Sequence, residues 1–152
     1  MTAQENIALV RSQLDLFNSR HSDPAWLNKA VAALAEDYEQ IDVPSGSITH
    51  GPDGLKQLNL FFAEGFPDST TEITNVFATE EQAIVEFTGR GTNSGPLHMP
   101  TGDIPPTGRY AELRFCQVWQ IKGGKIVSQH IYYDLMTMLQ QLGLAPLPGQ
   151  EE

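Results

Sequence analysis

The chain has 152 residues, enough for one domain with a core of its own and too few for two. Its 19 acidic residues against 9 basic ones give a formal net charge of −10, which argues against nucleic acid and anionic membranes as partners. Because Cys116 is the only cysteine, an internal disulfide and a cysteine-rich metal site are excluded.

The first half of the chain is predicted to be mainly helical. Thr2 and Glu5 fit a capping box before an apolar repeat at helical spacing, which runs to about residue 21. Asp23-Pro24 favours the start of a second helix, with Leu34 on its apolar stripe, and Gly51-Pro52 favours the start of a third. Between them, residues 38–43 are predicted to form a short strand.

The second half is predicted to be mainly strands, followed by one short helix. The expected strands span residues 70–78, 82–90, 109–121 and 125–134, and the helix follows Asp134. Residues 92–108 contain four prolines and three glycines, so we expect a long irregular loop that covers a pocket mouth. Helices first and strands afterwards predict an α+β fold, with helices packed on one face of an antiparallel sheet.

Gly123-Gly124 is a two-residue hairpin signal, and it predicts a cross-strand register. If this pair forms the loop, the predicted cross-strand pairs are Trp119 with Ser128, Gln117 with His130, Phe115 with Tyr132 and Leu113 with Asp134. Opposed residues share a face, so one face would combine an apolar wall with a few polar groups, as small-molecule pockets do. A one-residue slip would change these partners, and the polar residues would otherwise face water.

Asp134 is the main catalytic candidate. A partly desolvated carboxylate has a raised pKa and can act as a general base or acid. The alternative is a helix N-cap, because Asp134 stands directly before a helical pattern. His130 is a second catalytic candidate, and the histidines show no metal-ligand spacing, so no metal site is expected.

The candidate substrate-binding residues are Gln117, whose amide needs a partner in an apolar strand face, and Tyr132, which would orient a carbonyl oxygen. The remaining members of this set are Trp119, Phe115, Leu113, Asn93 and Tyr38.

Several segments together resemble the SnoaL-like polyketide cyclases of the nuclear transport factor 2-like superfamily, which includes ketosteroid isomerases. The matching segments are 65–68, 91–97, 105–109, 124–126, 132–134 and 140–144. The resemblance implies a cone-shaped, curved antiparallel sheet around N-terminal helices, with the pocket inside and a homodimer formed through the outer sheet face. It also implies a carboxylate acid/base on the last strand, at the position of Asp134, working without cofactor or metal. Asn93 stands where the family often has histidine.

These expectations give one domain over residues 1–145, with a disordered tail over 146–152, in a cytoplasmic protein without a signal peptide. The expected partner is a small apolar or aromatic carbonyl ligand, with no nucleic acid and no membrane. The expected function is a cofactor-independent cyclase or isomerase. The alternatives are a non-catalytic carrier or sensor of an apolar ligand and an epoxide-type hydrolase on the same fold.

Overall fold

The computed structural model describes residues 1–146 and residue 149. The expected tail therefore lies largely outside the described residues. The described elements, in chain order, are α1 (Ala3–Asn18), α2 (Trp26–Ala32), β1 (Leu34–Asp42), β2 (Ser47–His50), α3 (Asp53–Gly65), β3 (Thr70–Ala78), β4 (Gln82–Thr92), β5 (Leu97–Met99), β6 (Gly102–Ile104), β7 (Tyr110–Lys122), β8 (Lys125–Tyr133) and α4 (Leu135–Gln141).

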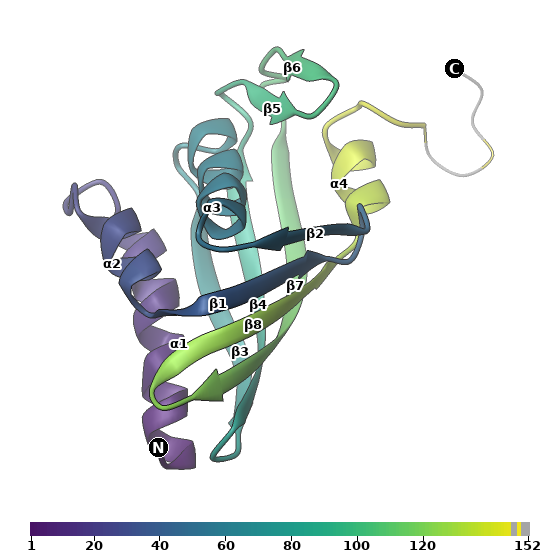
Figure 1. The fold of residues 1–152 in the computed structure, drawn as a ribbon. Helices are drawn as coiled ribbons and strands as arrows, with labels where there is room; N and C mark the ends of the chain where they lie inside the picture. The colour runs from purple at the N-terminus through teal and green to yellow at the C-terminus, as the bar shows by residue number, and fades with distance from the viewer. Residues whose placement is uncertain (147–148, 150–152) are drawn as a thin grey trace.

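A six-stranded sheet with the order β2-β1-β8-β7-β4-β3 forms the body of the molecule. The sheet curves around the helices, with α1, α2 and α3 on its concave side and α4 at one end (Figure 1). This confirms the predicted α+β fold. One strand pair departs from the antiparallel expectation, because β1 runs parallel to β8.

The predicted start of α1 is confirmed, whereas α2 begins later than predicted. Thr2 and Glu5 form the expected capping box, with each side chain bonded to the other residue's backbone N–H. The second helix begins at Trp26 and not at Asp23, because the Asp23 carboxylate accepts the Ala25 backbone N–H within a turn. Leu34, expected on that helix, is the first residue of β1.

The segment from Thr92 to Gly108 is not wholly irregular, as the sequence had suggested. It contains the short hairpin β5–β6, which the prolines and glycines flank. Leu97 is fully buried against the end of α3, and the His98 ring contacts Glu64 of α3. The hairpin is therefore attached to α3, and its residues do not line the cavity described below.

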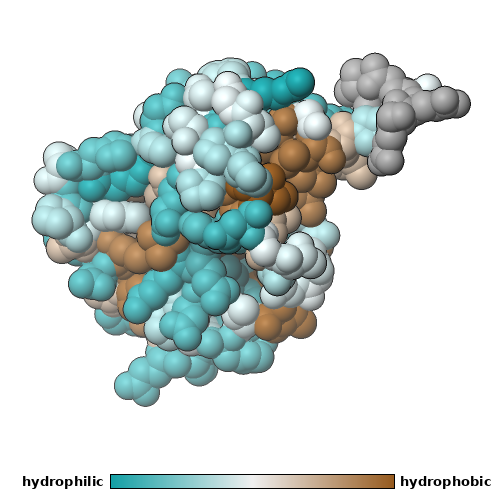
Figure 2. Space-filling view, turned by 90° about the horizontal axis from the view of Figure 1, so that it is seen from above, coloured by the Kyte–Doolittle hydropathy of each residue, from teal (hydrophilic) through white to brown (hydrophobic). Residues whose placement is uncertain are grey.

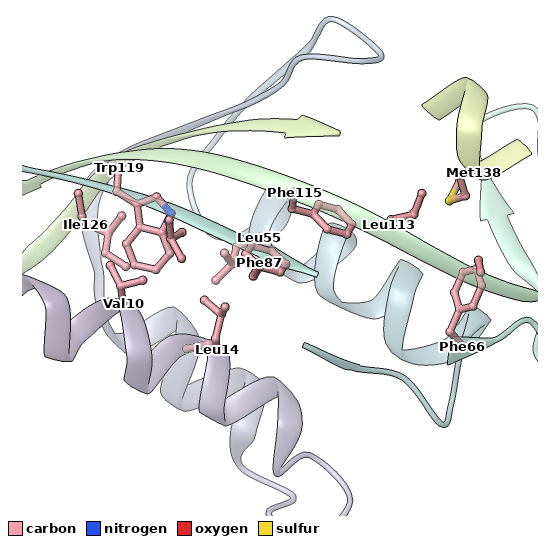
Figure 3. Close-up of a cluster of buried hydrophobic side chains, with 14 of the residues drawn as sticks. Val10, Leu14, Leu55, Phe66, Phe87, Leu113, Phe115, Trp119, Ile126 and Met138 are labelled. Atoms are coloured by element: carbon pink, nitrogen blue, oxygen red, sulfur yellow. The ribbon is translucent and has the colours of Figure 1, made fainter. Parts of the chain in front are cut away.

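The core fills the space between the helices and the concave face of the sheet. Trp119, Phe115 and Leu113 project from β7 towards the helices, and Val10 and Leu14 of α1 approach from the other side (Figure 3). Every second residue of β7 from Ala111 to Ile121 is buried, which is the expected pattern for a strand with one covered face.

Hydrophilic residues dominate the surface seen from above, in keeping with the net charge of −10 (Figure 2). The largest apolar area in that view lies on the side where Figure 1 places α4. No described helix is both long enough and apolar enough to cross a bilayer.

Candidate functional site

A cavity opens between the helices and the concave face of the sheet, with about 920 Å³ of empty space, its open mouth included. Its wall comes from α1, α2, α3, the residues after α3, and strands β3, β4, β7 and β8. The lining residues are Gln13, Leu14, Phe17, Ala30, Leu55, Leu58, Asn59, Phe62, Phe66, Ser69, Thr70, Thr71, Phe87, Gly89, Arg90, Gly91, Ala111, Leu113, Phe115, Gln117, Trp119 and Gln129.

Six aromatic side chains belong to this wall. Phe115 stacks on Phe87 with ring centroids 4.9 Å apart, and Phe62 meets Phe115 edge to face at 5.4 Å. Such pairs hold each other in fixed orientations. Gly89 lies beside the Phe115 ring, where a Cβ atom would come within 3.3 Å of it. The wall is thus a preformed apolar surface.

A β-bulge in β8 changes the register that the Gly123-Gly124 turn had predicted. Close to the turn the prediction is right, since Lys122 pairs with Lys125 and Ile121 with Ile126. Val127 is an extra residue on β8, so Gln120 pairs with Ser128 and every later pair is shifted by one. A one-residue shift exchanges the two faces of the strand.

The predicted placement of His130, Tyr132 and Asp134 with Gln117 is therefore wrong. His130 pairs with Val118, and Tyr132 with Cys116, on the outer face of the sheet. Neither residue lines the cavity.

The bulge brings Gln129 and Tyr133 to the concave face in their place. Trp119 pairs with Gln129, and Phe115 with Tyr133. Of these two β8 residues, Gln129 lines the cavity, while Tyr133 packs against Phe62 and Phe115 behind the cavity wall.

Asp134 is the N-cap of α4, which was the structural alternative considered for it. One carboxylate oxygen accepts the Thr137 backbone N–H at 3.0 Å, and the other accepts the Thr137 hydroxyl at 2.8 Å. These hydrogen bonds, the backbone one first, lower the pKa of Asp134 below its usual value. A general base at neutral pH is helped by a raised pKa, so this environment does not prepare Asp134 for that role.

The polar part of the cavity wall includes two strand amides, Gln117 and Gln129, that bond to buried aromatic neighbours. Trp119 donates its indole N–H to Gln117 Oε1 at 3.0 Å. Tyr38 is fully buried behind the wall, where its hydroxyl lies 2.8 Å from Gln40 Oε1 and 3.2 Å from Gln129 Oε1. Burial raises the pKa of Tyr38, so its hydroxyl stays protonated.

Four of the predicted substrate-binding residues, Leu113, Phe115, Gln117 and Trp119, lie together in this wall. Tyr38 lies behind it.

Asn93 has a different environment. It is fully buried away from the cavity, where its amide donates to the carbonyls of Gly65 and Gly95, each at 2.9 Å, and accepts from Thr107. It ties the segment after β4 to the end of α3.

Among the described lining residues, Arg90 is the only one with a charged side chain. Its guanidinium pairs with Glu112 and with Glu72, the latter at 3.4 Å, on the outside of the sheet. Within the part of the chain that the structure describes, no group of three or more acidic, histidine or cysteine residues is arranged to hold a metal ion. The cavity is therefore a neutral environment.

Sequence reasoning missed three of the cavity's amides, Gln13, Asn59 and Gln129. Gln13 and Asn59 stand within helical patterns among other polar residues, where an inward-facing amide cannot be recognised. Gln129 could be found only by locating the bulge, which no residue in the strand marks.

The curved sheet around helices, with a cavity inside it, is the fold of the nuclear transport factor 2-like proteins. The chain belongs to the SnoaL-like polyketide cyclase family, whose model matches residues 9–142. No curated protein sequence matches the chain.

Solved structures share this fold at low sequence identity. A SnoaL-like protein from Jannaschia sp. CCS1 is 17% identical with a TM-score of 0.81, covering 95% of this chain and 96% of that one. AclR from Streptomyces galilaeus is 19% identical with a TM-score of 0.76, covering 95% and 89%. A protein with a ketosteroid isomerase-like fold from Catenulispora acidiphila, solved with trimethylamine, is 17% identical with a TM-score of 0.64, covering 88% and 93%.

Proposed function

We propose that this protein binds a small, neutral, largely apolar carbonyl compound of polyketide type in the cavity. The composition of the cavity wall carries this proposal. Six aromatic side chains and four side-chain amides line the wall, and no carboxylate, histidine, lysine, cysteine or tyrosine is among the described lining residues. A charged ligand would lose its hydration without gaining a counter-ion, whereas a neutral ring system is favoured by apolar burial.

Gln117 is the residue that would make the cavity prefer ligands with a carbonyl group. Its oxygen is occupied by the indole N–H of Trp119, so its amino group is the part left for a ligand. An amino group in an apolar wall is matched by a carbonyl oxygen, and an apolar molecule without an acceptor would leave it unpaired.

A second candidate function is cyclisation or isomerisation of such a ligand, which membership of the SnoaL-like polyketide cyclase family favours. That chemistry removes a proton next to a carbonyl group and needs a base. The candidates from the sequence, Asp134 and His130, both lie outside the cavity wall. A carrier or sensor needs no base and so fits this geometry better. An epoxide-type hydrolase has less support, because no described lining residue is a carboxylate.

Calorimetric titration with 1-tetralone, a two-ring ketone, tests the binding proposal. Ala111→Phe fills the cavity from β7, and Val118→Phe makes the same kind of enlargement on the outer face of that strand. We expect wild type and Val118→Phe to bind 1-tetralone and Ala111→Phe to lose binding while remaining folded. Equal affinity in Ala111→Phe would place the ligand elsewhere and overturn the proposal.

Deuterium exchange tests the catalytic candidate separately. If the protein abstracts a proton beside the carbonyl, 1-tetralone in D₂O gains deuterium at C2 faster than in buffer alone, as mass spectrometry measures. Loss of this acceleration in Asp134→Asn would support Asp134 as the base. No acceleration in wild type, with binding intact, would support the carrier or sensor function.

We also propose a homodimer through the outer face of the sheet. The strand registers align Ile41, His130, Val118, Ile84 and Phe77 in one row across five strands on this face. Phe77 is 60% exposed and Ile84 is 41% exposed, so the row offers apolar surface for burial. Sedimentation analysis should show a dimer for wild type and a monomer for Ile84→Arg. A monomeric wild type would contradict this assembly.

A further inference from the structure

The hydrogen-bonding character of the cavity depends on which end of each amide faces inwards, and for two of the four amides the backbone decides this. Asn59 places its nitrogen 2.9 Å from the Leu55 carbonyl, and Gln13 places its nitrogen 3.1 Å from the Ala30 carbonyl. A carbonyl oxygen only accepts, so the amino groups must occupy these positions. Both residues therefore keep their oxygens for other partners, and Gln13 Oε1 is buried without one.

Gln117 has the opposite orientation. The indole N–H of Trp119 only donates, so the Gln117 oxygen must face Trp119. Its amino group has no partner among the described residues, and the side chain is only 8% exposed. Gln117 is thus a fixed donor in the cavity wall.

The orientation of Gln129 follows from counting the protons that Tyr38 can offer. Gln40 donates its amino group to the Gly54 carbonyl at 2.9 Å, so its oxygen faces Tyr38 and takes the one hydroxyl proton at 2.8 Å. No proton is left for a second acceptor 3.2 Å from the same hydroxyl. The Gln129 amide is paired there only if its nitrogen faces Tyr38 and donates to the phenolic oxygen.

We propose that Gln129 presents its oxygen to the cavity and that the cavity therefore selects hydroxylated aromatic ketones. One carbonyl oxygen of the ligand accepts from Gln117, and a hydroxyl group elsewhere on the ligand donates to Gln129. Gln117 and Gln129 are diagonal neighbours on one sheet face, because Trp119 is the residue paired with Gln129. This ligand class rests on the proposed binding function and narrows it from any neutral ketone to ketones that carry a separate donor.

Nuclear magnetic resonance tests the amide orientation without any ligand. We expect the Nε2 protons of Gln129 to show strong nuclear Overhauser effects to the ring protons of Tyr38. Effects to the cavity-facing indole protons of Trp119, with none to Tyr38, would show the reverse orientation and overturn the inference.

Calorimetry tests the ligand class with two probes of nearly the same shape, 6-hydroxy-1-tetralone and 6-fluoro-1-tetralone. Only the hydroxyl can donate to Gln129, while both probes keep the carbonyl. One added hydrogen bond in a desolvated site predicts roughly five- to tenfold tighter binding of the hydroxy probe. Gln129→Met should remove this preference, and Gln120→Met, the same change on the outer face of β7, should keep it.

The outcomes distinguish the preference for a hydroxylated ligand from the binding function itself. Equal affinity of wild type for the two probes would overturn the donor preference and leave the binding function intact. A preference that persists in a folded Gln129→Met variant would also overturn it, because another residue would then be the acceptor. Failure of both probes and of 1-tetralone to bind would refute the binding function itself.

Discussion

Replacing Gln117 by glutamate would change the amide donor of β7 in the cavity wall into a carboxyl group of nearly the same shape. The oxygen that accepts from Trp119 at 3.0 Å would be retained, and the amino group that faces the cavity would be lost. Because the side chain is only 8% exposed, the new carboxyl group would be desolvated with one hydrogen-bond donor beside it. We expect desolvation to dominate and to raise its pKa above the unfolded-state value of about 4.3.

The expected cost in stability follows from this shift. A rise of about two pKa units lowers the free energy of unfolding by about 2.7 kcal/mol at pH 7, because folding must then either bury a charge or take up a proton. Because the pKa is higher in the folded state, the folded protein binds a proton at pH values where the unfolded chain has lost it. The variant should therefore approach wild-type stability below about pH 4.3 and lose stability as the pH rises through the raised pKa.

Ligand affinity should follow the same titration. At pH 7 the ionised carboxylate cannot donate to the ligand carbonyl, and we expect 1-tetralone to bind at least roughly tenfold more weakly. At pH 5 the protonated carboxyl group donates again, so much of the affinity should return.

Urea unfolding and calorimetric titration at pH 5 and pH 7 measure these two effects. The matched control is Gln120→Glu on the same strand, because Gln120 lies on the outer face and pairs with Ser128. The control should show little pH dependence in either assay. Equal pH dependence in the two variants, or 1-tetralone binding at pH 7 that Gln117→Glu leaves unchanged, would refute the role of Gln117 in the cavity.

Three further predictions concern the frame around the cavity. Asp134→Ala should lower the melting temperature because it removes the N-cap of α4, whereas Asp134→Asn should retain the cap. Neither variant should change the affinity for 6-hydroxy-1-tetralone. Weaker binding in Asp134→Asn would contradict the account. The pKa of His98 is raised by its hydrogen bonds to Asp103 and then Glu64, so its stabilising contribution should be present below about pH 6.5 and disappear as the pH rises through the raised value. Hydrogen exchange of β5–β6 should become faster over that range in wild type, and His98→Gln should show no such change. The Arg20 guanidinium donates to the backbone carbonyls of residues 17, 66, 67 and 69. Arg20→Met should therefore lower the free energy of unfolding, measured by urea titration, by about 3 kcal/mol. A loss below about 1 kcal/mol would show that water replaces these hydrogen bonds.

The sequence was sufficient for the features that depend on local chemistry. The capping box of Thr2 and Glu5, the turn at Gly123-Gly124 and the alternation along β7 all follow from backbone geometry and apolar spacing, and all appear in the structure. Because the alternation of β7 was readable, Leu113, Phe115, Gln117 and Trp119 were correctly grouped on one face.

The sequence was not sufficient for the partner strand. Residues 126–133 mix apolar and polar side chains without a clear period of two, so their composition does not reveal the extra residue Val127. The parallel pairing of β1 with β8, which places Gln40 beside Gln129, joins segments far apart in the chain. Both features decide which polar groups reach the cavity.

The central claim is that the ligand binds in the cavity on the concave side of the sheet and away from Asp134. Amide chemical-shift mapping during titration with 1-tetralone tests this claim directly. We predict the largest shifts at the side-chain N–H groups of Trp119, Gln117 and Gln129, with little change at Asp134 and Tyr132. Shifts that cluster instead at Tyr132, Asp134 and the first turn of α4 would contradict the account and would return the candidate site to the end of the last strand.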